Sequence, residues 1–506
     1  MHISHTSAAV GGSGAPGPAT EPTDGSPAGS QGAPRRVFIE SFGCQMNDYD
    51  VERMLEVLRK SGYERTESAE AADLVVINTC SIREKAENKA ASAAGRYKPL
   101  KDKNPNLVLA IGGCVAQQEG PALLKRIPMA DLTFGPDQIP SLPRHVAEIR
   151  GQDPDRPDEW ASRPRAPQGR YRLRLAKTEV IDVEDYEFLD ADPRPGDVSV
   201  TALVTIQKGC DNYCAYCVVP NTRGREVSRP AEQVVAEVRR FVERGAREVT
   251  LIGQNVNAYH AIGSPDGDDF AELLRRVCAV EGLRRVRYTT SHPHYFSRKV
   301  ADAFRDLPAL CPWLHLPVQA GSTAVLKSMA REYTREAYLD KIAYLRSVCP
   351  DISLSTDIIV GYPGESEADF QDTLSLLSIV RYDSIYSFSY SRRPGTPAFD
   401  AVDDVSADEK SRRLQAVQAL QREITAERMG RMVGRIEPIL VEGLARMGNG
   451  QLCGRTGGNH TVNFTAPPEV DGAALIGEIV PVRITQAKIH TLSGELVPGA
   501  EVRGAA

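Results

Sequence analysis

Three cysteines lie close together in the segment GCDNYCAYC, where Cys210, Cys214 and Cys217 have the spacing C-x3-C-x2-C. The segment directly follows the apolar stretch VTALVTIQ, which we expect to be a strand. Three such thiolates can bind three irons of a four-iron cluster and leave the fourth iron open. A structural zinc site needs a fourth protein ligand and usually has paired C-x2-C units, and no fourth cysteine is nearby in the sequence. The spacing therefore favours an iron-sulfur cluster over zinc or three unconnected core thiols.

A second set of cysteines is spread over the first part of the chain. Cys44, Cys80 and Cys114 each follow an expected strand, in FIESFGC, LVVINTC and LAIGGC. The carboxyl ends of neighbouring parallel strands share one edge of a sheet, where such folds bind their ligands. Independent buried cysteines are common, but three successive strand ends favour a second three-thiolate cluster. The remaining cysteines have no such spacing, and we interpret them as packing residues: Cys278, Cys311, Cys349 and Cys453.

The elements that position these cysteines are predicted by hydrophobic periodicity. Short apolar runs that alternate with helical periods indicate an α/β class, with a parallel sheet in a first domain and six strands of a partial (β/α) barrel in a second. Short alternating runs divided by glycines predict a small antiparallel β-barrel at the end. The expected parts are a disordered Gly, Ala, Ser and Pro-rich tail (1–34), an N-terminal domain (35–149), a linker (150–195), the barrel (196–429) and the small C-terminal barrel (430–500).

Composition limits the class of protein. The 506 residues suggest about three domains. We expect a cytoplasmic protein, because we find neither a secretory signal nor a membrane span, so ten cysteines are more naturally ligands or core residues than disulfides. A net charge of -6 argues against a uniformly basic nucleic-acid binder. One segment, 410–435, has seven basic residues against two acidic ones, but charge alone favours a solvated helix face there.

The cysteine loop has a family resemblance. The pattern C-x3-C-x-aromatic-C after a first barrel strand resembles the signature of the radical S-adenosylmethionine (SAM) superfamily. The segment DIIVGYPGE, with Gly361, Gly364 and Glu365, is similar to that superfamily's motif beside the adenine of SAM. The resemblance implies that the open iron binds the amino and carboxylate groups of SAM, which is cleaved to methionine and a 5′-deoxyadenosyl radical. It also implies that Tyr216 lies against the adenine.

The arrangement from about residue 35 to 500 resembles the methylthiotransferases, which have an N-terminal cluster domain, a radical SAM core and a C-terminal TRAM domain. This resemblance implies two [4Fe-4S] clusters, with SAM as cosubstrate. One SAM would methylate sulfur at the Cys44, Cys80 and Cys114 cluster, and a second would start the replacement of a C–H hydrogen from the other cluster. One departure is MAREYT around Arg331, where the family usually has Asn at the position of Ala330.

Several segments resemble in particular the methylthiotransferases that act on N6-dimethylallyladenosine at position 37 of tRNA: SFGCQMNDYD, NTCSIREKAENK, CVVPNTRGREVSRP, LIGQNVNAY, TSHP, HLPVQAGS and YSRRPGTPA. The implied product is the 2-methylthio form of that nucleoside. The alternatives are a methylthiotransferase for threonylcarbamoyl-adenosine in tRNA or for an aspartate of a ribosomal protein. The segment GCQMN favours the dimethylallyl substrate, because the corresponding segment is GCKVN in the threonylcarbamoyl enzymes and GCPKN in the ribosomal-protein enzymes. A non-catalytic RNA-binding protein with zinc is the alternative from another class.

The implied partners follow from the same resemblance. The target base would lie in the anticodon loop of tRNA, where it can be splayed out without opening a long duplex. The C-terminal barrel offers basic residues for RNA, namely Arg446, Arg455, Arg483 and Lys488. An electron donor such as a flavodoxin or ferredoxin is expected, the sulfur donor stays open, and a monomer is possible. Three histidines, His292, His294 and His315, are more typical of local hydrogen bonding than of catalysis, because radical chemistry at a C–H bond needs no imidazole base.

Overall fold

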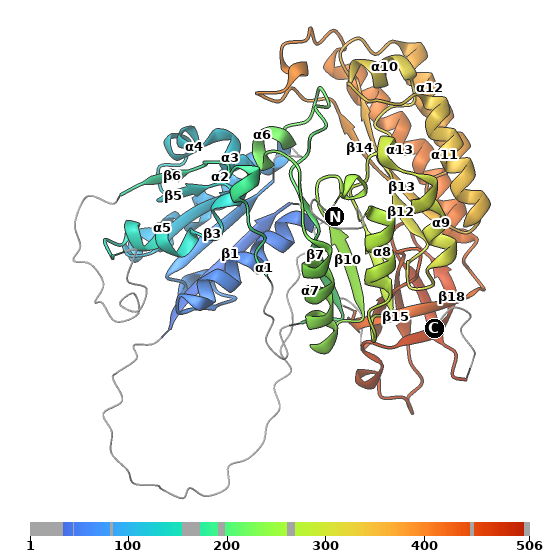
Figure 1. Ribbon diagram of the computed structural model, residues 1–506, viewed down its shortest axis with the longest axis horizontal. Helices are drawn as coiled ribbons and strands as arrows, with labels where there is room; N and C mark the ends of the chain where they lie inside the picture. Colours follow the sequence, from blue (N-terminus) through green and yellow to red (C-terminus); the bar gives the residue numbers. More distant parts are fainter. Residues whose placement is uncertain are drawn as a thin grey trace, which may run out of the picture. The chain divides into compact units, whose positions relative to one another are not determined.

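The structure is a computed structural model that describes residues 34–43, 45–80, 84–153, 173–190, 198–260, 269–445 and 450–499, with the side chains of 84–89 left aside (Figure 1). Two compact units, residues 1–179 and 180–506, make up the chain. The tail predicted over 1–34 falls almost wholly outside the described residues. Among the helices of these ranges, none has both the length and the apolar character needed to cross a membrane.

The first unit is built on a six-stranded parallel sheet in the order β2-β1-β3-β4-β5-β6. Its strands are β1 (Arg35–Phe42), β2 (Tyr63–Arg65), β3 (Leu74–Thr79), β4 (Val108–Gly113), β5 (Leu132–Phe134) and β6 (Leu175–Lys177). Its helices are α1 (Gln45–Lys60), α2 (Glu84–Lys103), α3 (Cys114–Glu119), α4 (Pro121–Arg126) and α5 (Leu142–Ile149). Every residue of β3 and β4 is buried, which explains why both strands have continuous apolar sequences.

The sheet extends into the segment 150–195 that the sequence suggests as a linker. Strand β6 pairs in parallel with β5 and forms an edge of the sheet. The side chain of Arg174, just before β6, donates to the carbonyl oxygens of Ala130 (2.8 Å) and Ile127 (3.1 Å) and so fixes the strand to the turn before β5. Three residues are too few to show periodicity, which is why the pattern did not indicate this strand.

The second unit contains the predicted partial (β/α)6 barrel, which the structure confirms. Two three-stranded parallel sheets, β7-β10-β11 and β12-β13-β14, adjoin through a bridge between Val286 and Leu310. The strands are β7 (Thr201–Thr205), β10 (Glu248–Ile252), β11 (Arg285–Tyr288), β12 (Trp313–His315), β13 (Ser353–Val360) and β14 (Ser384–Ser389). The helices are α6 (Val219–Arg223), α7 (Ala231–Glu243), α8 (Phe270–Cys278), α9 (Arg298–Asp306), α10 (Thr323–Ser328), α11 (Arg335–Val348), α12 (Glu367–Val380) and α13 (Ala407–Gly430).

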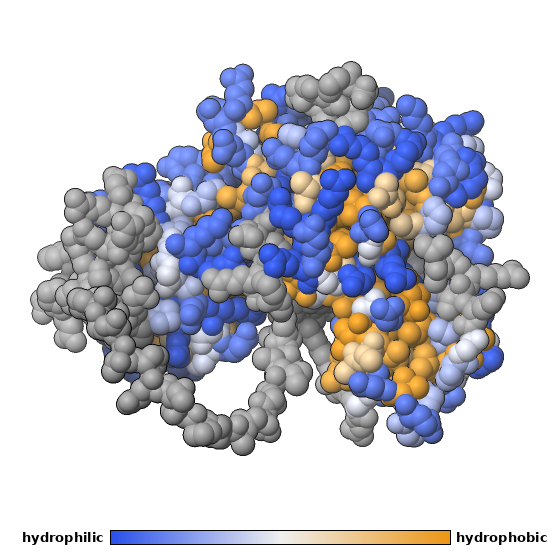
Figure 2. Space-filling model, turned by 60° about the horizontal axis from the view of Figure 1, so that its bottom comes forward, coloured by the Kyte–Doolittle hydropathy of each residue, from blue (hydrophilic) through white to orange (hydrophobic). Residues whose placement is uncertain are grey.

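The predicted C-terminal barrel is also confirmed, as a closed barrel in the order β15-β16-β17-β19-β18, although it is not wholly antiparallel, because β17 pairs in parallel with β19. Its strands are β15 (Ile436–Leu444), β16 (Leu452–Arg455), β17 (Thr461–Thr465), β18 (Ile479–Ala487) and β19 (Leu492–Leu496). Apolar side chains such as Phe464 and Val482 fill its interior. Exposed hydrophobic residues, among them Leu444 and Ile476, lie on its outside, and Figure 2 shows hydrophobic residues gathered over this part of the molecule.

Two arginines of β11, Arg285 and Arg287, attach the small barrel to the larger one. Arg287 donates to the carbonyl oxygens of Gly457 (2.6 Å) and Thr456 (2.8 Å), and it forms an ion pair of 3.0 Å with Glu248. Arg285 donates to two further carbonyl oxygens of the small barrel, those of Arg455 and Pro438 (2.7 Å each). The side chains of Arg287 and Glu248 are both 2% exposed. The small barrel is therefore fixed to the strands and not merely tethered.

We expect Arg287→Met to lower the free energy of unfolding by about 3 kcal/mol, because the Glu248 carboxylate would stay buried without its cation. Urea denaturation followed by the fluorescence of Trp313, next to the interface residue Pro312, measures this loss. Arg284→Met is the control, since the Arg284 side chain is 43% exposed and its pair with Glu478 is 3.9 Å long; a loss under about 0.5 kcal/mol is expected there. Equal losses in the two variants would contradict the prediction.

Candidate functional site

The loop that carries the first cysteine set is held by a short hairpin, β8 (Gln207–Lys208) with β9 (Val227–Ser228). Gly209 has a φ of +75°, and a Cβ there would collide with the carbonyl group of Arg225, so only glycine fits. The next residue, Cys210, donates its backbone N–H to the carbonyl oxygen of Gly224 (3.2 Å). Asp211 accepts from the Arg225 guanidinium (2.7 Å) and from the backbone of Glu226 (3.1 Å). The loop is thus closed, on both sides of Cys210, against the segment that leads into β9.

Each sulfur of this set has a hydrogen-bond donor. The backbone N–H of Asn212 donates to Cys210 Sγ (3.4 Å), and that of Val219 donates to Cys217 Sγ (3.5 Å). The Arg331 guanidinium donates to Cys214 Sγ (3.3 Å). Donors on all three sulfurs suit thiolates, which accept hydrogen bonds, better than thiols. The three residues therefore fit an iron-sulfur cluster.

Cys210 and Cys214 are buried, and Cys217 is partly exposed. Burial, together with the neighbouring thiols, raises the pKa of Cys217 to about 12, and burial also raises the pKa of Cys210. Within the part of the chain that the structure describes, no three His, Cys, Asp or Glu residues are arranged around a single metal ion. A four-iron cluster does not require that arrangement, because each thiolate binds a different iron. The lack of such a group among the described residues therefore does not argue against a cluster.

Arg331 was not a predicted site residue, yet its guanidinium contacts one of these sulfurs. It is 8% exposed, and besides Cys214 it donates to the hydroxyl of Tyr333 (2.9 Å) and the carbonyl oxygen of Pro317 (3.0 Å). It lies 117 residues beyond Cys214, so no sequence spacing could have indicated the contact. The only signal in the sequence was the segment MAREYT around it, where this chain has Ala330 in place of the Asn that is usual in the family.

The other predicted SAM contacts have distinct surroundings. Tyr216 is partly buried beside Arg331, and burial raises its pKa. Gly361 and Gly364 follow β13 with φ values of +68° and +79°. Glu365 is 3% exposed and accepts from the backbone N–H of Gly361 (2.6 Å) and from Arg413 (2.8 Å). One oxygen of Glu365 therefore braces the turn, and its contact with SAM stays a prediction.

The carboxyl ends of the neighbouring strands carry polar and strained residues that the sequence did not single out. Asn255, after β10, is 2% exposed, and neither its amide nitrogen nor its amide oxygen has a partner in the described ranges. Thr290, after β11, and Gln319, after β12, have φ values of +72° and +74°. Positive φ is rare outside glycine, and such strain gathers at functional sites. These residues lie at the end of the barrel where such folds bind their substrates.

The second cysteine set lies in the first unit. Cys80 follows β3 and is 4% exposed, and Cys114 follows β4 and is 8% exposed. The residues just before them, Thr79 and Gly113, are direct partners in the sheet, so the two cysteines leave neighbouring strands side by side. Gly113 has a φ of +95°, and a Cβ there would collide with the Thr79 carbonyl. Cys44 lies outside the described residues.

The start of α1 is joined to the same strand end. The side chain of Asn47, three residues after Cys44, donates to the carbonyl oxygen of Thr79 (2.9 Å). The side chain of Asn78 donates in turn to the carbonyl oxygen of Asn47 (2.9 Å). The segment that follows Cys44 is thus bound directly beside Cys80, and this supports the predicted grouping of the three thiols at one edge of the sheet.

Two of the three candidate histidines have local partners. His294 Nδ1 lies 3.3 Å from the carbonyl oxygen of Glu332. His315 Nδ1 lies 3.0 Å from the hydroxyl of Ser355, and its Nε2 lies 3.6 Å from the Asp357 carboxylate. These contacts agree with local hydrogen bonding. His292 differs, because one of its ring nitrogens has no partner in the described ranges.

Comparisons with known proteins agree with this arrangement. Three family models match: "Uncharacterized protein family UPF0004" over residues 36–135, the "Radical SAM superfamily" over 204–377 and the "TRAM domain" over 430–497. A solved radical S-adenosylmethionine methyltransferase, TsrM from Kitasatospora setae, has a similar fold, with a TM-score of 0.50 at 16% identity over 72% of this chain and 77% of that one. The fold and the cysteine loop together define a radical SAM enzyme.

Curated relatives specify the family. A protein of Syntrophotalea carbinolica named tRNA-2-methylthio-N(6)-dimethylallyladenosine synthase is 44% identical over 92% of this chain and 100% of its own length. A protein of Geobacter metallireducens with the same name is 46% identical over 91% of this chain and 98% of its own. The chain belongs to the family of the tRNA-2-methylthio-N(6)-dimethylallyladenosine synthases.

The departure at Ala330 has a physical consequence. Ala330 is exposed and has a φ of +55°, a conformation that Asn adopts more readily than Ala. We expect Ala330→Asn to raise the free energy of unfolding by about 0.5 to 1 kcal/mol, measured by urea denaturation. Ala426→Asn, at an exposed position inside helix α13, is the control and should lower it by about 0.5 kcal/mol. A loss of stability at position 330 would contradict this account.

Proposed function

We propose that this chain converts N6-dimethylallyladenosine at position 37 of tRNA to its 2-methylthio derivative. The observation that carries the proposal is the identity of 44 to 46% over nine tenths of the chain to synthases of that name. Both cysteine sets are present in this chain, and the three sulfurs of Cys210, Cys214 and Cys217 accept hydrogen bonds as thiolates do. The threonylcarbamoyl and ribosomal-protein substrates are less well supported, because these relatives carry the dimethylallyl name.

Enzymes of this class use SAM and [4Fe-4S] clusters. We assign one cluster to Cys210, Cys214 and Cys217 and a second to Cys44, Cys80 and Cys114. When bound, the first supplies the electron that cleaves SAM to methionine and a 5′-deoxyadenosyl radical, and the second carries the sulfur that is methylated and inserted.

The chain's own residues prepare the first site. Cys210 and Cys214 are 9% and 6% exposed, which limits the access of water to these two sulfurs. Arg331 holds a fixed positive charge against Cys214, and Tyr333 holds the guanidinium in place from its other side. Gly364, which has open space where a side chain would lie, lets a flat ligand approach the backbone of the turn that Glu365 and Arg413 brace, whereas Gly361 packs against the Lys410 side chain. These groups suit the binding of SAM beside Tyr216.

The basic residues of 410–435 are not a free RNA surface. Most are paired with acidic groups: Lys410 with Asp403, Arg412 with Glu409, Arg413 with Glu365, Arg428 with Asp383 and Arg431 with Glu427. In the TRAM domain, Arg455 pairs with Glu442, whereas Arg483 and Lys488 are exposed. Arg446 lies outside the described residues. We therefore assign the anticodon loop to the mouth of the barrel and the RNA backbone to Arg483 and Lys488. We also propose a flavodoxin or ferredoxin as the electron donor and a monomer as the active form.

The assay is anaerobic incubation of the reconstituted protein with SAM, a reductant and tRNA that bears N6-dimethylallyladenosine. Nucleoside mass spectrometry should show the methylthio product with the wild-type chain. Cys80→Ser and Cys214→Ser should reduce it below detection, because each removes one iron ligand. Cys349→Ser, a change at a cysteine outside both sets, is the control and should keep the product. SAM cleavage without the methylthio product would reject the substrate but keep the radical chemistry.

Arg331 should also set the reduction potential at the first site. A buried positive charge favours the more negative, reduced form of a group beside it. We expect Arg331→Gln to make the midpoint potential more negative in a titration followed by electron paramagnetic resonance. Lys327→Gln, at an exposed position on α10, is the matched control and should leave the potential unchanged. An unchanged potential in Arg331→Gln would contradict this role.

A further inference from the structure

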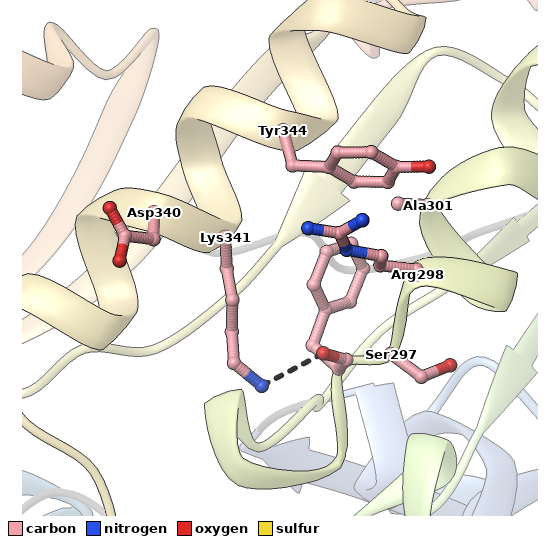
Figure 3. A pocket seen from close by; sticks show the side chains of 7 residues that line it. Ser297, Arg298, Ala301, Asp340, Lys341 and Tyr344 are labelled. Carbon is pink, nitrogen blue, oxygen red and sulfur yellow. Dashed lines mark hydrogen bonds between the residues drawn. The ribbon is translucent and has the colours of Figure 1, made fainter.

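The loop after β11, residues 289–296, is held rigidly from two sides. Lys341 of α11 donates to the carbonyl oxygens of Pro293 (2.7 Å), Phe296 (2.9 Å) and His294 (3.3 Å), and Figure 3 shows one of these bonds as a dashed line. From the loop after β10, the Asn257 side chain exchanges two hydrogen bonds with the backbone of His292 (2.8 and 3.0 Å). A loop fixed in this way presents its side chains in one orientation.

His292 has a defined tautomer in this loop. Its Nδ1 accepts a hydrogen bond from the backbone N–H of His294 (3.2 Å), so Nδ1 carries no proton. Burial and the nearby Arg331 cation lower the pKa of His292 to about 2, which keeps the ring neutral. The proton of the neutral ring is therefore on Nε2.

This Nε2–H group has no acceptor. Its nitrogen is buried, the residue is 7% exposed, and nothing in the ranges that the structure describes accepts a hydrogen bond from it. The hydroxyl of Ser291, the preceding residue, is likewise buried without a partner there. A buried donor without a partner costs about 1 to 3 kcal/mol. Two such groups in a loop this firmly held are typical of a site that a ligand completes.

The surroundings indicate which ligand this is. The His292 ring packs edge-on against Tyr333, with the ring centres 5.7 Å apart. The Tyr333 hydroxyl accepts from Arg331, and Arg331 donates to Cys214 Sγ. One aromatic ring thus separates the imidazole from the guanidinium that contacts the cysteine loop. Tyr295 of the same loop also donates to Asn212 of the cysteine loop (3.4 Å), so a ligand bound at the cysteine loop lies beside residues 289–296.

We propose that His292 binds an adenosyl ligand at the mouth of the barrel, by donating a hydrogen bond from Nε2 to an oxygen or nitrogen acceptor of that ligand. The inference rests on the proposed function, which provides two adenosyl ligands, SAM and the target nucleoside of the tRNA. Ser291 adds a second hydrogen-bonding group next to it. In this role His292 is a binding residue that acts as a neutral donor, not as a base.

Two substitutions distinguish the Nε2 donor of His292 from the hydrogen bond that its Nδ1 accepts from the backbone of His294. His292→Asn places an amide oxygen where Nδ1 accepts from His294, so it keeps the turn and loses the Nε2 donor. His292→Gln places an amide N–H near the position of Nε2, so it keeps a donor and loses the turn contact. Equal iron content and an unchanged unfolding midpoint, followed by Trp313 fluorescence, would show that a variant is folded.

For each folded variant, SAM affinity is measured by equilibrium dialysis, reductive SAM cleavage is measured without tRNA, and methylthio product is measured with tRNA. If the acceptor is on SAM, His292→Asn weakens SAM binding and slows cleavage by about tenfold or more, and His292→Gln restores much of both. If the acceptor is on the target nucleoside, SAM binding and cleavage keep their wild-type values and only product formation falls, by a similar factor, with partial restoration by Gln.

Wild-type behaviour of His292→Asn in all three measurements would overturn the proposal, as would equal losses in the Asn and Gln variants. These outcomes are distinct from a failure of the proposed function, in which the wild-type chain itself makes no methylthio product. SAM affinity and reductive SAM cleavage can still be measured in that case, because neither measurement requires tRNA.

Discussion

The hydrogen bond from the Arg331 guanidinium to Cys214 Sγ is the interaction on which the first site depends. Arg331 is 8% exposed, and its other partners are a tyrosine hydroxyl and a backbone carbonyl oxygen. The structure gives it no ion pair with a carboxylate in the described ranges. A buried cation without a counter-charge costs several kcal/mol. A neutral thiol does not offset that cost, whereas sulfur that carries negative charge does, so the arginine itself favours a cluster over a set of packing cysteines.

The cysteines of the site could be predicted from the sequence, whereas their partners could not. The cysteines were predictable because their spacing is local, and the strands before them were predictable because β3 and β4 are apolar throughout. The partners of those cysteines were not predictable in this way. Arg331 contacts Cys214 across 117 residues, and Arg287 contacts Gly457 across 170 residues. Contacts of this separation leave no periodicity in the sequence.

The ion pairs of the basic residues in α13 could not be predicted from the sequence either. The cations of α13 formed an obvious basic run, but three of their partners, Glu365, Asp383 and Asp403, lie outside that helix. Composition could therefore count the charges without showing that they are paired. Strand β6 was missed for a different reason. It has three residues between segments of irregular sequence, and three residues are too few to show alternation. The catalytic fold was thus accessible from local patterns, and the electrostatics of the site was not.

The two ends of the radical SAM strands have different roles. At the start of β11, its first and third residues, Arg285 and Arg287, fix the TRAM domain through four backbone carbonyl oxygens. At the last residues of the strands lie the strained Thr290 and Gln319 and the cysteine loop. Stability at the first end and chemistry at the second is the usual division in such barrels.

This division limits the kind of substrate that could contact both ends. The longest radical SAM strand, β13, has eight residues, which corresponds to about 26 Å. Because the TRAM domain is fixed to the strand starts, it cannot swing to the barrel mouth without breaking buried hydrogen bonds of Arg287. A free nucleoside is too short to span that length, whereas a stem with a loop is long enough. The attachment of the TRAM domain by two buried arginines therefore favours a base presented within a folded RNA over the same base free in solution.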